Sequence, residues 1–195
     1  MSNTQEIPIR PYARLLTMLG DQLIKNERIA LVELIKNSYD ADSPWVKLSF
    51  CDFTDDYGIL PKSKIIIEDA GCGMSETIIT KHWLNPATPE KRLRKKNNRA
   101  RTTGGRILQG EKGIGRFAIL KLGRKIDVIT RAENDSFEYL IEYDFTHYDD
   151  DFLEEDNKPK ELFIDDIKVK VTKRKPHIFN ERGIDCQRAL ILAGF

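Results

Sequence analysis

Three polar residues, Glu33, Asn37 and Asp40, follow a spacing that would bring two carboxylates and an amide together on a helix. At about 100° per residue, the three side chains fall within about 60° of one another. A neutral amide oxygen is a hard ligand of the kind that Mg²⁺ accepts, and a carboxylate one turn away could act as a general base on water. The alternative is an ordinary amphipathic helix with a solvated polar face. Its core-facing stripe would consist of Leu31, Leu34, Ile35 and Ser38.

A second candidate site lies where the apolar run 65–67 is followed by acidic residues and then by alternating glycines. Asp69, at the end of such a strand, could accept a hydrogen bond from a ring amine at the bottom of a pocket. Gly71 and Gly73 would let a flat ring approach the backbone, and Met74 would pack on that ring. The alternative is a plain strand followed by a turn, because Asp and Gly are common turn residues.

The most glycine-rich stretch runs from 104 to 117, and the overlapping segment 91–106 carries eight Lys or Arg and no acidic residue. Gly110, Gly113 and Gly115 open a predicted helix, and backbone N–H groups at such a helix start form an anion site. The spacing is neither that of a Walker A loop nor that of a dinucleotide-binding fingerprint. The basic segment fits either a lid over a nucleotide or a nucleic-acid-binding arm with a steep salt dependence.

The surrounding pattern predicts the elements that would hold these residues. Helical periodicity covers 11–25 and 27–41, Ser75 would cap a helix over 75–84, and a further helix over 115–123 would end at Gly123. Alternating or β-branched runs predict strands at 45–53, 64–69, 124–132, 136–145 and 168–172, with 124–132 and 136–145 forming a hairpin. This order indicates an α+β fold, a two-layer sandwich with helices on one face of a mixed, mostly antiparallel sheet.

The composition of the 195-residue chain fits one globular domain, with 40% hydrophobic and 32% charged residues and a formal net charge of +1. The N-terminus has no signal-peptide pattern, and no apolar stretch approaches the roughly 20 residues that span a bilayer. The three cysteines and three histidines are scattered, which argues against a disulfide framework or a zinc site. We therefore expect a cytoplasmic protein without a membrane anchor.

Taken together, the three motifs resemble the GHKL superfamily of ATPases, which includes gyrase, heat-shock chaperones of the ninety-kilodalton class, histidine kinases and MutL. The N box of that family is similar to Glu33, Asn37, Asp40 and Ala41. Its adenine box is similar to Asp69, Gly71 and Gly73, and its lid motif to Gly110, Gly113 and Gly115. The resemblance covers roughly residues 13–145, and the form GEKGIGRFAILKLG looks most like the prokaryotic and MORC-like members of the chaperone branch.

The resemblance implies a Bergerat-type site for ATP and Mg²⁺. It assigns Asn37 as the Mg²⁺ ligand, Glu33 as the general base that activates water, and Asp69 as the acceptor for the adenine amine. Glu33 favours a hydrolytic ATPase, because histidine kinases usually carry Asn at this position. The other nucleotide contacts that it implies are Asp40, Ala41, Gly71, Gly73, Met74, Thr88, Lys91, Gly110, Lys112, Gly113, Ile114, Gly115, Arg116, Phe117 and, in place of a late Gly-Thr step, Thr172.

The resemblance also implies a nucleotide-gated clamp, in which lid closure is coupled to ATP-dependent formation of a homodimer. The final run ALILAGF looks abrupt, and we interpret residues 1–195 as the N-terminal part of a longer protein. Residues 110–117 would form the phosphate-cradling hinge, and 91–106 a mobile, poorly ordered cover. Two alternatives remain, namely DNA binding through 91–106 and a nucleotide sensor that does not hydrolyse ATP.

Overall fold

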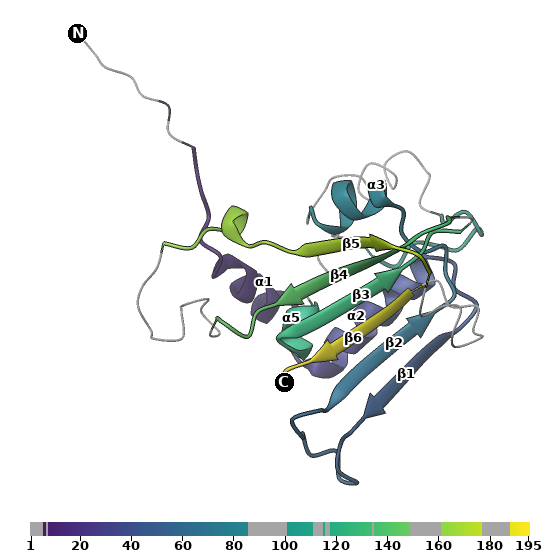
Figure 1. Ribbon diagram of the computed structural model, residues 1–195, viewed down its shortest axis with the longest axis horizontal. Coiled ribbons are helices and arrows are strands. Elements are labelled where there is room, and N and C mark those ends of the chain that lie inside the picture. Colours follow the sequence, from purple (N-terminus) through teal and green to yellow (C-terminus); the bar gives the residue numbers. More distant parts are fainter. Residues whose placement is uncertain are drawn as a thin grey trace.

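The computed structural model describes residues 6, 8–85, 101–110, 115, 118–133, 135–148, 161–176 and 188–195. These residues form two layers, in which helices pack on one face of a six-stranded sheet (Figure 1). The α+β sandwich predicted from the sequence is therefore confirmed. Over the ranges just given, the structure contains no helix with the length and apolar character needed to span a bilayer.

Two consecutive helices, α1 (Leu15–Leu23) and α2 (Glu27–Asp40), precede the first strand. Asn26 caps α2, because its side-chain oxygen accepts a hydrogen bond from the Ile29 N–H at 3.0 Å. Ser75 caps the short helix α3 (Glu76–Ile78), as the sequence predicted, and α3 continues into a π-helical turn at Ile79–Trp83. Other helical segments are α5 (Ala118–Leu122) and a 3₁₀ turn at Ile164–Asp166.

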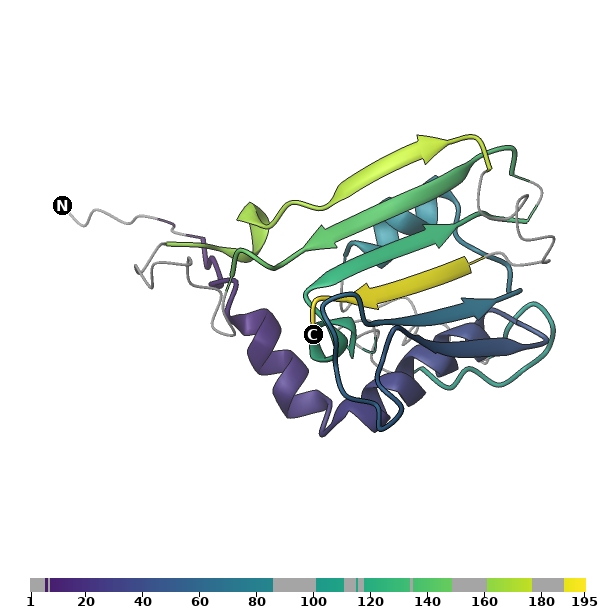
Figure 2. The same ribbon diagram turned by 60° about the horizontal axis from the view of Figure 1, so that its bottom comes forward.

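The strands are β1 (Val46–Cys51), β2 (Lys64–Asp69), β3 (Lys125–Thr130), β4 (Glu138–Asp144), β5 (Lys170–Arg174) and β6 (Arg188–Ala193). Their order across the sheet is β1-β2-β6-β3-β4-β5, and every neighbouring pair is antiparallel. The predicted mostly antiparallel pairing is confirmed, and these six strands include no parallel pair. Figure 2 shows β6, the yellow strand, between β2 and β3.

β6 is the strand that the sequence pattern did not predict. The run ALILA looks like an abrupt end in the sequence, yet it pairs with β2 on one side and with β3 on the other. Leu190 and Leu192 are 2% and 0% exposed, which places this run in the centre of the core. A short, continuous apolar run is what a strand buried in the middle of a sheet requires.

The hydrophobic core lies between the sheet and the helices. α2 contributes Ala30, Leu34 and Ser38, which share one face of the helix at a spacing of four residues. The predicted core stripe is therefore confirmed for Leu34 and Ser38. Strands supply alternate residues to the same core, as in Ile65 and Ile67 of β2. This packing fixes the position of α2 relative to the end of β2, where the candidate site lies.

Candidate nucleotide-binding site

The end of α2 and the loop after β2 are bound directly to each other. The Cys72 N–H donates to the Ala41 carbonyl oxygen at 2.9 Å. One turn earlier on α2, the Ser38 hydroxyl donates to Asp69 Oδ2 at 3.0 Å. The first and second sequence motifs therefore form one continuous structure, as the resemblance implied.

Asp69 is 1% exposed and lies at the centre of a buried polar network. Its Oδ2 accepts from the Ser38 hydroxyl and from Arg188 Nε at 2.7 Å, and it also forms an ion pair with Arg188 Nη2 at 2.6 Å. Arg188 Nη2 also donates to Ser38 Oγ at 2.8 Å, and Asp69 Oδ1 accepts from the Gly71 N–H at 3.0 Å. The sequence motifs did not identify Arg188, because it begins the strand that was not predicted.

The loop of residues 70–76 is held to the sheet at further points. The Thr130 hydroxyl oxygen accepts from the Met74 N–H at 2.9 Å, and the Tyr139 hydroxyl donates to Glu76 at 3.0 Å. Met74 is 8% exposed and packs in the hydrophobic core. These side chains belong to residues that are directly opposite one another on neighbouring strands and so form one row across the sheet. The row runs through β2, β6, β3 and β4 and consists of Asp69, Arg188, Thr130 and Tyr139. A single register of the sheet therefore sets the shape of this loop.

Gly71 and Gly73 are needed for the packing of the protein itself. A Cβ atom at Gly71 would lie 2.7 Å from both the Cβ and the carbonyl oxygen of Ala41. A Cβ atom at Gly73, whose φ is +63°, would lie 1.9 Å from the carbonyl oxygen of Arg131. The prediction that these glycines make room for a flat ring is corrected accordingly, because protein atoms fill that room.

Glu33 and Asn37 lie one turn apart on α2, beside the third motif. A Cβ atom at Gly115 would lie 3.3 Å from Glu33 Oε2, so this glycine packs against the predicted base. Glu33 Oε1 pairs with the Lys36 ammonium at 2.6 Å. The amide nitrogen of Asn37 is buried, and no residue in the described ranges forms a hydrogen bond with it. This amide therefore retains bonding capacity for a ligand.

A Mg²⁺ ion at this site would take most of its ligands from the nucleotide and from water. Across the part of the chain that the structure describes, no group of three or more His, Cys, Asp or Glu residues could hold a metal ion. Mg²⁺ keeps several waters and usually takes one or two protein ligands together with substrate phosphates. The side-chain oxygen of Asn37 is the group that would hold the ion, and Mg²⁺ held there would neutralise phosphate charge.

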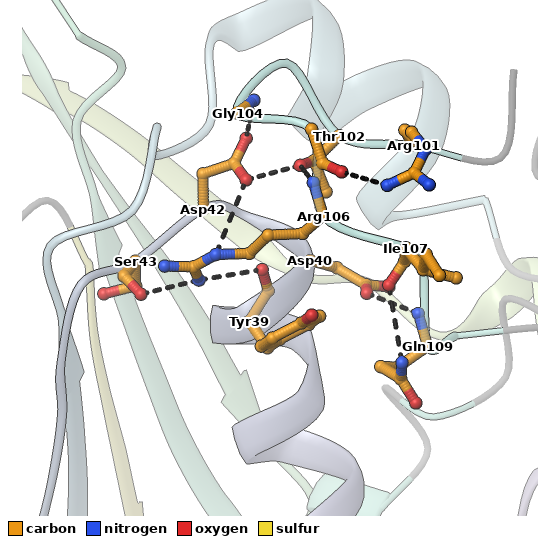
Figure 3. A network of polar contacts seen from close by, with 11 residues as sticks. Tyr39, Asp40, Asp42, Ser43, Arg101, Thr102, Gly104, Arg106, Ile107 and Gln109 are labelled. Atoms are coloured by element: carbon orange, nitrogen blue, oxygen red, sulfur yellow. Dashed lines mark hydrogen bonds and ion pairs between the residues drawn. The ribbon is translucent and has the colours of Figure 1, made fainter.

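Asp40 binds the main chain that leads into the glycine-rich motif. Its Oδ1 accepts from the Gln109 N–H at 2.7 Å, and its Oδ2 accepts from the Gly110 N–H at 3.0 Å (Figure 3). The N–H of Gly110, a predicted phosphate contact, is thus directed to a carboxylate. Asp40 fixes the point from which the motif starts.

Residues 101–107 form a tight hairpin that docks on the same end of α2. The turn closes through a hydrogen bond from the Gly105 N–H to the Thr102 carbonyl oxygen at 3.1 Å. Asp42 accepts from the Thr102 hydroxyl and, at 2.8 Å, from the Gly104 N–H (Figure 3). These bonds lower the pKa of Asp42 below its ordinary value of 3.8, with the Thr102 hydroxyl as the largest cause and burial opposing it.

Arg106 completes this docking. Its Nη1 donates to the Ser43 carbonyl oxygen at 2.8 Å, and its guanidinium lies over the Tyr39 ring at 5.0 Å from the centroid. The expectation that 91–106 form one mobile cover is therefore wrong for 101–106, and 91–100 lie outside the described residues. The sequence motifs identified neither Asp42 nor Arg106. Asp42 could have been noticed as the second acidic residue of the sequence DAD, which lies at the end of the predicted helix.

Thr172 is not brought to the site. It lies on β5, at the edge of the sheet, and is in register with Leu140 of β4. The row that contains Thr172 and Leu140 continues across the sheet to Glu68 of β2. Successive side chains of a strand point to opposite faces, so Thr172 projects from the face opposite to that of Asp69. The predicted contact of a late hydroxyl group with the nucleotide is corrected accordingly.

The remaining predicted nucleotide contacts lie outside the described residues. They are Thr88, Lys91, Lys112, Gly113, Ile114, Arg116 and Phe117.

A two-layer sandwich in which an acid–amide helix face, a strand-end aspartate and a glycine-rich segment converge defines a class of nucleotide-binding domain. The family model described as histidine kinase-, DNA gyrase B- and HSP90-like ATPase matches residues 25–172. The chain belongs to this family, and this membership supports ATP binding. No curated protein sequence matches the chain.

Proposed function

We propose that this domain binds ATP together with Mg²⁺ and hydrolyses it, using Glu33 as the general base. The observation that carries the proposal is the packing of Gly115 against Glu33 Oε2, on the same helix that holds Asp69 through Ser38. A predicted base and the two predicted nucleotide-binding segments thereby meet along α2.

The two oxygens of Glu33 have different surroundings. Oε1 is paired with Lys36, and Oε2 is the oxygen beside Gly115. In the proposed mechanism, Oε2 accepts the proton of the attacking water next to the bound triphosphate. Asn37 holds the ion, and Asp69 holds the base of the nucleotide. Hydrolysis of this type depends mainly on positioning and charge neutralisation.

The docked hairpin supports a lid with one fixed end. Asp40 and Asp42 bind residues 102–110 to the end of α2, immediately before the glycine-rich motif. This anchor would tie the proposed lid to the nucleotide site, and closure of the lid over ATP would be coupled to homodimerisation of the full-length protein. The clamp, the chaperone-like branch and the cytoplasmic location all stay predictions.

Two substitutions on α2 test the residue roles. Glu33→Gln should leave the affinity for ATP nearly unchanged and lower kcat at least about 100-fold, because the base is lost. The control is Glu27→Gln, which removes an exposed carboxylate from the same helix and should leave kcat unchanged. Asn37→Ala should abolish the increase in ATP affinity that Mg²⁺ produces, as measured by calorimetry with and without the ion.

Full hydrolysis by Glu33→Gln would contradict the assignment of the base. ATP binding by the wild-type protein without any turnover, in the full-length chain, would favour the sensor alternative. For the DNA alternative, the structure directs Arg106 inward to Ser43 and Tyr39, which removes one cation from the basic segment. Tight, ATP-independent and salt-sensitive DNA binding in a filter assay would nevertheless establish that alternative.

A further inference from the structure

Asp69 forms a buried ion pair with Arg188, a residue that none of the three sequence motifs includes. Arg188 is 7% exposed and Ser38 is 0% exposed, so the carboxylate shares a nearly dry environment with a cation and a hydroxyl. Buried ion pairs often give little net stability, because removing both charges from water is costly. The position of this pair, at the end of β2 that faces α2, points to a role in the site.

The hydrogen bonds on Asp69 are distributed unequally between its two oxygens. Oδ2 accepts two hydrogen bonds, from Nε of Arg188 and from the Ser38 hydroxyl, and it is also ion-paired with Nη2 of Arg188. Oδ1 accepts from the Gly71 N–H, and the described residues provide no other donor to it. A carboxylate offers about four lone-pair positions, roughly two on each oxygen. Oδ2 is therefore saturated, whereas Oδ1 retains a position for an external donor.

We propose that Arg188 is a positioning residue that makes Asp69 an acceptor for the exocyclic amine of an aminopurine, by occupying Oδ2 and leaving Oδ1 to the ligand. This inference rests on the proposed function. An arginine is always charged and offers only hydrogen-bond donors, so its guanidinium uses the Asp69 side chain as an acceptor. Such an arrangement would favour a ring that carries an amine at this position over one that carries a carbonyl oxygen.

The register of the sheet explains why an arginine from β6 can do this. Arg188 stands between Asp69 of β2 and Thr130 of β3 in one row. Its guanidinium therefore approaches Asp69 from the side of the sheet, whereas Ser38 approaches from α2. The Gly71 N–H comes from the loop and reaches the other oxygen, Oδ1. The carboxylate is thus held in one orientation by three separate parts of the chain.

The test compares two nucleotides that differ only in the amine. Calorimetry gives the Kd of ATP and of purine riboside triphosphate, which lacks the exocyclic amine. For the wild-type protein we expect ATP to bind about 10- to 100-fold more tightly, as a hydrogen bond to a charged group allows. In Arg188→Met this ratio should fall to nearly 1, and Arg188→Lys should restore part of it.

A third nucleotide provides a readout that a purely structural role would not change. Arg188→Met removes the partner that holds Asp69 in the orientation that accepts from an amine and disfavours a carbonyl oxygen. Inosine triphosphate, which carries a carbonyl oxygen in place of the amine, should then bind more tightly to Arg188→Met than to the wild-type protein. The matched control is Arg174→Met, which breaks a second ion pair, at 2.6 Å to the buried Glu138, and should lower the unfolding temperature without changing the ratio.

If Arg188→Met does not fold, the double variant Asp69→Asn with Arg188→Met removes both charges and should fold without the preference for ATP. Variants at Arg188 that retain the full wild-type ratio would overturn the inference while leaving ATP binding intact. A wild-type protein that binds none of the three nucleotides would instead overturn the proposed function, and with it this inference.

Discussion

Asp42 shows how much of this site depends on a residue outside the family motif. One carboxylate binds the hydroxyl of Thr102 and the N–H of Gly104, and Arg106 lies beside it at 3.9 Å. All three groups favour the charged form. Because the pKa of Asp42 is lower in the folded chain than its ordinary 3.8, its contacts stabilise the hairpin above that pH. The stabilisation is lost as the pH falls through the lowered pKa.

The amide proton of Gly104 offers a direct measurement of this titration. Its NMR chemical shift should follow the ionisation of Asp42, with a midpoint below 3.8. Thr102→Val removes the largest cause of the shift and should move the midpoint upward, towards the ordinary value. A midpoint at or above 3.8 in the wild-type protein would show that the hairpin is not held by this carboxylate.

Gly73 and Gly105 both have positive φ, of +63° and +84°, but different surroundings. Gly105→Ala introduces only the left-handed strain of about 1–2 kcal/mol, since no atom lies within 4 Å of the added Cβ. Gly73→Ala adds a collision with the Arg131 carbonyl, and we expect a total loss above about 3 kcal/mol. Chemical denaturation of both variants measures the difference. Equal losses would mean that the loop after β2 can move away from β3.

At the scale of elements, the sequence was sufficient to predict those helices and strands whose periodicity, caps or turns lie within the element itself. The periodicity of α2, the Ser75 cap of α3 and the turn between β3 and β4 lie within short windows of sequence. The roles of Gly71 and Gly73 could not be predicted, because the atoms that exclude a side chain belong to distant segments. For the same reason, the partner of Asp69 could not be predicted, since Arg188 lies 119 positions away.

β6 was missed because its five consecutive apolar residues, ALILA, carry no information about the neighbours of the strand in a sheet. Its central position makes its side chains as important as those of any strand. Leu192→Ala should lower the free energy of unfolding by about 2–5 kcal/mol, because Leu192 is fully buried. The control Leu60→Ala, at a site that is 43% exposed, should change it by less than about 0.5 kcal/mol. A small loss for Leu192→Ala in urea denaturation would argue against the central placement of β6.

At the scale of the whole molecule, the strand order places β6, the sixth strand in the sequence, between β2 and β3. β1 and β2 contact β3, β4 and β5 within the sheet only through β6. A large share of the pairing is therefore between residues far apart in the sequence, which slows folding. The family match ends at residue 172, so β6 and the Arg188–Asp69 contact lie beyond the region that the family model describes.

This order of strands has a consequence for the synthesis of the protein. Until residues 188–193 have left the ribosome, β2 and β3 each lack a neighbour, and Asp69 lacks its cation. A chain that stops before residue 188 therefore leaves the edges of β2 and β3 unpaired, which favours aggregation. We expect such a truncated chain to bind ATP more weakly than residues 1–195, because Asp69 lacks Arg188.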